Sequence, residues 1–161
     1  MAGNIIAGVS AGIAIIALIV SIYTSKKQNK IALFELKYKT LTQLKLILGF
    51  SECIKDIDDT NIILLNFNVF FNSRIEKTTT NETLQEVLAL INLLRKDIFA
   101  SAYLFKKQYI QEIEDMIDTM ELFLVSSIKK ESDSKSKQEF INSCKRFKNT
   151  ILPILEEETK I

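Results

Sequence analysis

An uncharged apolar run near the start of the chain, from Ile5 to Tyr23, constrains this sequence more than any other feature. It reads IIAGVSAGIAIIALIVSIY, and the first charged side chain in the sequence is Lys26. A helix of this length extends roughly 28 Å at about 1.5 Å per residue, close to the roughly 30 Å of a bilayer's hydrocarbon core. The run is apolar on every face, whereas a helix packed in a small soluble domain keeps a polar side. We therefore predict a transmembrane anchor over residues 1–25 and a separate domain over residues 26–161.

A secretory signal peptide is the main alternative for this run. Such a peptide carries basic residues before its apolar stretch and small residues at a cleavage site after it. The segment Met1-Ala2-Gly3-Asn4 has no basic side chain, although the small residues between Ser21 and Ser25 would permit cleavage. The missing basic region and the length of the run favour a retained anchor.

The lysines that follow the run predict its orientation. Basic residues beside a span remain on the cytoplasmic side. They are Lys26, Lys27, Lys30, Lys37 and Lys39. We expect a single-pass protein of the cell inner membrane, with its N-terminus outside and its C-terminal domain in the cytoplasm. Lys26, Lys27 and Lys30 set this topology and can also attract anionic lipid headgroups, at roughly 1 kcal/mol each.

Small residues recur along the predicted span. Gly8 and Gly12 form a G-x-x-x-G pattern, and Ala7 and Ala11 repeat the spacing on a neighbouring face. Small side chains allow two membrane helices to approach closely, so we hypothesise a homo-oligomer formed through these four residues. The alternative is that glycine and alanine are simply common in membrane helices.

The composition after the span predicts an all-α domain. The sequence has one proline and four glycines, of which three lie within the first twelve residues. A chain so poor in residues that break helices is typical of a helical bundle. We predict that the membrane helix continues into an antiparallel bundle of about four helices. The formal net charge of +1 gives no reason to expect nucleic acid as a partner.

Apolar periodicity places the individual helices. The first should continue from the membrane to about Gly49 or a few residues beyond it. Residues 62–75 are rich in aromatic and branched side chains, but the spacing of Ile62, Leu65 and Val69 favours a short helix over a strand. One of Asp59, Thr60 or Asn61 is expected to cap it, and Thr79 with Glu82 has the form of a capping box.

The second half of the chain is one long helical stripe followed by a polar segment. The stripe over residues 84–124 is too long for one helix of a compact domain, so we place a bend or turn at Phe105–Gln108. Residues 129–139 should form a mobile loop, Pro153 should end or kink the last helix, and residues 156–161 should form a tail. The predicted core contains Phe34, Tyr38, Leu41, Leu88, Ile91, Ile98, Ile113, Met120, Phe140 and Phe147.

No set of residues predicts an enzyme, a metal site or a cofactor site. The carboxylates of residues 112–121 would suit a metal in a helical bundle, but such sites combine glutamate with histidine, and this sequence has no histidine. We interpret these carboxylates as a solvated helix face. Cys53 and Cys144 are expected to be free and buried, and neither has an imidazole to activate it.

The segment SKKQNKIALFELKY, residues 25–38, resembles a group of small bacterial membrane proteins. In that group an N-terminal span leads into a K-Q-N-K-I-A-L-F-E-x-R-Y type segment and then into a helical domain; here Lys37 stands in place of the arginine. The stretches AYLFKK (residues 102–107) and FKNTILP (residues 147–153) are also similar to later parts of such proteins. The resemblance implies a bacterial source and this architecture.

Two function hypotheses follow. In the first, the chain is a non-enzymatic interaction, scaffold or sensor protein that holds a cytoplasmic helical bundle at the membrane, with membrane lipids and an unknown protein as its partners. In the second, it is an effector of a toxin or phage-defence module, whose span oligomerises and perturbs the bilayer. A tether needs only length and apolarity, whereas an effector needs the small residues of the span to pack.

Overall fold

Every regular element in the described part of the chain is a helix. This computed structural model describes residues 2–76, 79–101, 104–130 and 134–159, and for residues 2–14 it describes the backbone alone. These residues form six helices and no strand: α1 (Ala2–Cys53), α2 (Thr60–Phe71), α3 (Thr80–Phe99), α4 (Lys107–Lys129), α5 (Ser134–Thr150) and α6 (Leu152–Glu158). The all-α prediction is confirmed, and within the described residues two of the helices, α2 and α6, are short.

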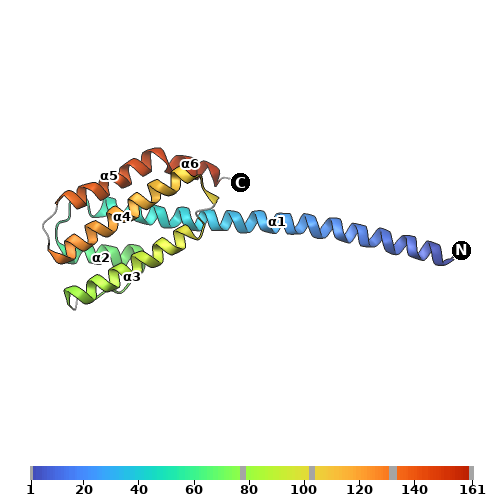
Figure 1. The fold of residues 1–161 in the computed structure, drawn as a ribbon, viewed down its shortest axis with the longest axis horizontal. Coiled ribbons are helices and arrows are strands. Elements are labelled where there is room, and N and C mark those ends of the chain that lie inside the picture. The colour runs from blue at the N-terminus through green and yellow to red at the C-terminus, as the bar shows by residue number, and fades with distance from the viewer. Residues whose placement is uncertain (1, 77–78, 102–103, 131–133, 160–161) are drawn as a thin grey trace. The chain divides into compact units, whose positions relative to one another are not determined.

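The chain divides into two compact units, Met1–Leu36 and Lys37–Ile161. Within the second unit, the end of α1 is followed by α2 to α6. There α4 lies between α3 and α5, and these three helices run in alternating directions (Figure 1). The turn between α3 and α4 falls between Phe99 and Lys107, slightly before the predicted position.

The residues that were predicted to begin or end helices lie at helix boundaries in the structure. The Asp59 carboxylate caps α2 by accepting hydrogen bonds from the backbone N–H groups of Asn61 (2.7 Å) and Ile62 (3.4 Å). The prediction of a helix rather than a strand is confirmed for residues 62–71, which belong to α2, whereas residues 72–75 lie beyond its end. Thr79 and Glu82 form the predicted capping box at the start of α3. Pro153 lies in the first turn of α6, where its missing N–H costs nothing, and α5 ends just before it.

Aromatic rings from four helices, α1, α2, α4 and α5, meet at the centre of the second unit. The ring centroid of Phe50 lies 5.7 Å from that of Phe67 and 6.0 Å from that of Phe140. Phe123 of α4 stacks on Phe140 at 5.9 Å. The remaining core is built from buried aliphatic residues of α1, α2, α3, α4 and α6, among them Leu44, Ile47, Ile63, Ile91, Ile98, Ile113, Met116, Met120 and Leu155.

Most of the predicted core is buried, with one clear error. Leu41, Ile91, Ile98, Ile113, Met120, Phe140 and Phe147 are buried, and Phe34 and Leu88 are half-buried. Tyr38 was expected in the core but is 59% exposed. It lies one turn before Leu41, where α1 enters the core with Thr40, Leu41 and Leu44. The apolar stripe therefore continues along the helix beyond the residues that cover it.

The predicted loop and the predicted tail are both helical in large part. α5 begins at Ser134, so the prediction of a loop over 129–139 is wrong from there on; residues 131–133 lie outside the described residues. The first turn of α5 is held by Ser136, whose hydroxyl is hydrogen-bonded to that of Ser126 (2.7 Å). The tail prediction, residues 156–161, is wrong for residues 156–158, which belong to α6; there Glu156 pairs with Lys45 of α1 (2.6 Å).

Candidate functional sites

The N-terminal unit exposes a continuous apolar segment. Each large apolar side chain from residue 15 to residue 23 is between 48% and 71% exposed, namely Ile15, Ile16, Leu18, Ile19, Val20, Ile22 and Tyr23. The lysines at 26, 27 and 30 that follow are exposed as well. Over the residues that the structure describes, no helix combines the length and the apolarity needed to cross a bilayer. The side chains of Ala7, Gly8, Ala11 and Gly12 lie outside the described residues.

A second apolar surface lies on α2. Ile62, Leu65 and Val69 are 45%, 62% and 72% exposed, and we call these three residues the α2 surface. Their spacing predicted the helix correctly, but the helix buries its other side, through Ile63 and Phe67. Thr60–Phe71 contains no charged residue, and its polar side chains are those of Thr60, Asn61, Asn66 and Asn68. Exposed apolar side chains at this spacing are typical of a contact site.

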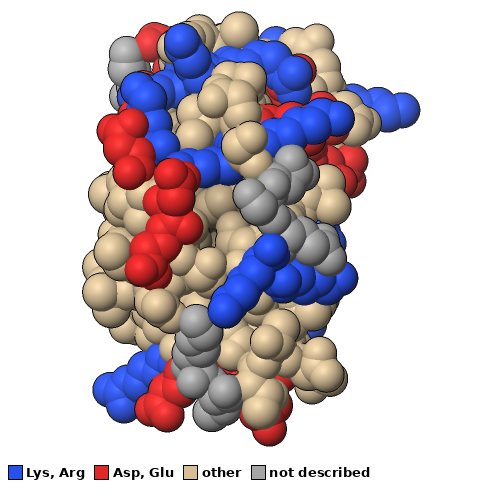
Figure 2. Space-filling model, turned by 90° about the vertical axis from the view of Figure 1, so that its left-hand side faces the viewer, with Lys and Arg blue, Asp and Glu red and all other residues tan. Residues whose placement is uncertain are grey.

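The charges at one end of the second unit are mixed. In Figure 2, which views the left-hand side of Figure 1, Lys and Arg side chains and Asp and Glu side chains are interspersed with uncharged surface. A nucleic-acid-binding face instead gathers its lysines and arginines into one basic patch. The mixed charges of this face therefore do not indicate a nucleic-acid-binding surface.

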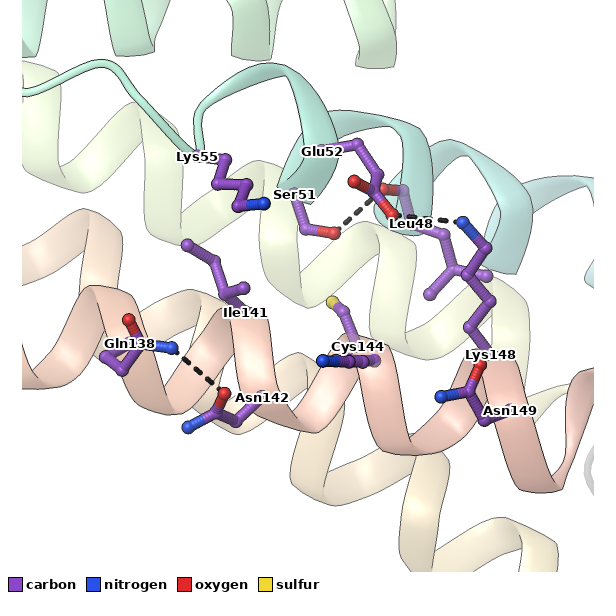
Figure 3. A pocket seen from close by; sticks show the side chains of 11 residues that line it. Leu48, Ser51, Glu52, Lys55, Gln138, Ile141, Asn142, Cys144, Lys148 and Asn149 are labelled. Atoms are coloured by element: carbon purple, nitrogen blue, oxygen red, sulfur yellow. Dashed lines mark hydrogen bonds and ion pairs between the residues drawn. The ribbon is translucent and has the colours of Figure 1, made fainter.

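A hollow of about 320 Å³ opens between the end of α1 and α5 (Figure 3). Leu48 and Ile141 provide its apolar lining, and the Cys144 thiol faces the Ser51 side chain across it. The charged and amide side chains around these are Glu52, Lys55, Lys145, Lys148, Gln138, Asn142 and Asn149. Glu52 and Lys148 are joined by an ion pair of 3.0 Å between Nζ and Oε1. The hollow thus combines a small apolar floor with a polar, mainly basic rim.

Two groups that line the hollow have pKa values shifted in opposite directions. The hydrogen bond and charge of Lys148 hold the pKa of the Glu52 carboxyl below its usual value, and the charges of Lys55 and Lys145 lower it further. Burial raises the pKa of the Cys144 thiol to about 12, and the nearby Ser51 hydroxyl lowers it by less. Cys144 is therefore a neutral thiol at physiological pH, without the thiolate that a nucleophile needs. Cys53 is free but exposed, which corrects the expectation that both thiols are buried.

The carboxylates of α4 connect helices. Arg95 of α3 binds Asp118 (2.6 Å) and Glu121 (2.9 Å), both on α4. On the other side, Arg146 of α5 pairs with two further α4 residues, Glu112 (2.7 Å) and Asp115 (3.2 Å). The interpretation as a merely solvated face is therefore too simple, because four of these carboxylates hold α4 to its neighbours. Among the described residues, no group of three or more ligand side chains is placed to hold a metal ion.

Sequence reasoning missed the hollow because its two walls are far apart in the chain. Glu52 and Lys148 are separated by 96 positions, and nothing in either local pattern links them. Of the residues that line it, Cys144 alone was singled out in the sequence, as a free and buried thiol. The chain matches no family model, no curated protein and no solved structure.

Proposed function

We propose that this protein is a non-enzymatic, membrane-anchored interaction protein that presents its helical domain in the cytoplasm. The observation that carries the proposal is the exposure of seven large apolar side chains from Ile15 to Tyr23, with no charged residue among them. Surface of this kind costs roughly 25 cal/mol per Å² in water. A bilayer removes that cost on all sides of the helix at once, whereas a groove on another protein covers one side.

The lysines after the segment support an inner-membrane anchor with the domain inside. Lys26, Lys27 and Lys30 are exposed, as residues in a headgroup region must be. Basic residues at this position retain the segment that follows them in the cytoplasm. The N-terminus is then outside, and the unit Lys37–Ile161 is cytoplasmic.

The α2 surface is the part of the domain that we propose to contact a protein partner. It is uncharged; Asp58, which pairs with Lys137 (2.8 Å), and Asp59 precede it, and Arg74 and Glu76 follow it. A partner helix with an apolar face would complement it. Such helix contacts are anchored by apolar residues spaced three or four apart, which is the spacing of Ile62, Leu65 and Val69.

Two measurements test the two parts of this proposal. Replacing Leu18 and Ile19 together by Lys should release the protein from membranes washed at high pH, whereas the wild type stays bound. Persistence of the double variant in washed membranes contradicts the anchor.

For the partner, a photo-crosslinking residue at position 65 should give a discrete adduct, while the same residue at the exposed α3 position Gln85 should not. Equal crosslinking at both positions contradicts a specific α2 contact, and an adduct of twice the chain's mass identifies a second copy.

The effector hypothesis is supported by the sequence pattern of the span. Gly8 and Gly12 would allow helices to pack closely in lipid, and a close-packed assembly is what a membrane-perturbing protein requires. The two hypotheses share the anchor and differ in whether the span must associate. Substitution of the two glycines therefore separates them.

A further inference from the structure

We propose that the hollow between α1 and α5 binds the phosphate group of a small anionic ligand. The hollow is formed entirely by residues of the unit Lys37–Ile161, so this inference does not depend on the membrane anchor. Its volume of about 320 Å³ is at the lower end of the range for small-molecule sites. A phosphate monoester or a diphosphate fits such a space, whereas a folded macromolecule does not enter it.

The charge of the rim selects an anion. Three lysines, Lys55, Lys145 and Lys148, face a single carboxylate, Glu52. Only Lys148 is paired with that carboxylate; among the described residues, Lys55 and Lys145 form no ion pair. Two uncompensated cations beside one hollow attract negative charge and repel metal ions. Lysine acts in phosphate sites as a flexible point charge. Lys145 and Lys148 belong to α5, and Lys55 lies in the turn that follows α1.

Hydrogen-bond donors complete the site. The side chain of Gln138 donates to Oδ1 of Asn142 (2.9 Å), which leaves the NH₂ group of Asn142 available to a ligand oxygen. Asn149 adds a second amide one turn beyond Lys145. The neutral thiol of Cys144 and the apolar side chain of Leu48 line the floor, where they favour the organic part of a phosphorylated compound over a free ion.

Glu52 has a specific part in this account, because it competes with the ligand. Its carboxylate now neutralises Lys148, and a bound phosphate would take over that lysine. Removing the negative charge of Glu52 should therefore strengthen binding, whereas removing a lysine should weaken it. This opposite response of neighbouring residues distinguishes an anion site from a hollow that has only a structural role.

The test uses the full chain in nanodiscs of phosphatidylcholine, with inorganic pyrophosphate as the probe and calorimetric titration as the readout. We expect Lys145→Gln to weaken binding about fivefold, the effect of one nearby unit charge in a water-exposed site. Glu52→Gln should strengthen it by a similar factor. Lys135→Gln is the matched control on α5, outside the hollow, and should leave binding unchanged. High salt should abolish binding of the wild type.

A second arm distinguishes the source of the phosphate. In nanodiscs that contain phosphatidylglycerol, a lipid headgroup in the hollow would block pyrophosphate and raise the unfolding temperature, in a manner lost in Lys145→Gln. If the ligand is instead a soluble compound, pyrophosphate binds equally in both kinds of nanodisc. The proposal is overturned if pyrophosphate does not bind in phosphatidylcholine nanodiscs and phosphatidylglycerol does not raise the unfolding temperature. It is also overturned if Lys145→Gln, Glu52→Gln and Lys135→Gln all behave as the wild type does.

Discussion

Phe70 of α2 lies with its ring against Gly49 of α1, so close that a β carbon on Gly49 would lie 2.7 Å from Cε1 of that ring. Glycine in the middle of a helix costs about 1 kcal/mol relative to alanine. Here it allows α2 to approach the backbone of α1 and brings Phe70 to within 6.2 Å of Phe50, centroid to centroid. The first helix was predicted to end at about Gly49 or a few residues beyond it, and α1 ends at Cys53. Gly49 lies within the last turns of that helix, where it leaves room for the Phe70 ring.

This contact predicts that a larger side chain at position 49 destabilises the domain. Gly49→Leu should lower the free energy of unfolding by about 1–3 kcal/mol, the usual cost of overpacking, despite the better helix propensity of leucine. Chemical denaturation of the full chain measures this. Adding Phe70→Ala should recover part of the loss, since it vacates the space that the introduced side chain needs. Strictly additive losses in the two variants would show that the residues do not interact.

Two apolar residues predict opposite responses to truncation. Ile91 is fully buried in α3, and Ile91→Ala should cost roughly 2–5 kcal/mol of unfolding free energy. Val69 on the α2 surface is 72% exposed, so Val69→Ala should change stability by less than about half a kcal/mol. The denaturant midpoints of the two variants, compared with that of the wild type, measure both changes in stability. A large loss for Val69→Ala would mean that this residue is covered within the domain and is not a contact site.

The buried thiol of Cys144 predicts a loss of stability at high pH. Burial raises its pKa from 9.0 to about 12, so the folded protein keeps the proton after the unfolded chain has released it. The stabilisation is complete below about pH 9 and decreases by roughly 1.4 kcal/mol per pH unit between that pH and the folded pKa. Denaturation at pH 8.5 and 10.5 should show this slope in the wild type and lack it in Cys144→Ala. Parallel pH profiles for the two proteins would contradict the assignment.

The helices and most of the core were predictable because they depend on local patterns. The capping box at Thr79, the stripe containing Ile91 and Ile98, and the stop at Pro153 all use information within one or two turns of the chain. The start of α5 was not predictable, because Ser136 is polar in sequence and is buried only through its bond to Ser126. The exposed side of α2 was not predictable either, since the helix has no charged residue to identify the side that meets solvent.

The small residues of the span predict an outcome that separates a tether from an effector. Gly8→Ile with Gly12→Ile keeps the segment apolar, and isoleucine favours insertion, so localisation should not change. The branched side chains would prevent close approach of two helices. For the tether that we propose, the double variant should retain the protein's cellular function. An unrelated anchor in place of residues 1–25 should preserve that function as well. Loss of activity with intact localisation, together with crosslinked oligomers of the wild type, would instead establish the effector.

The most direct test of the membrane-anchored account is the side of the membrane on which each end of the chain lies. Single cysteines at Ala2 and at Gln85, in a chain with Cys53→Ser and Cys144→Ala, are labelled by a maleimide that does not cross membranes. We predict that Ala2→Cys is labelled in intact cells, whereas Gln85→Cys is labelled only after the inner membrane is permeabilised. Labelling of Gln85→Cys in intact cells would contradict the account, because it would place the helical domain outside.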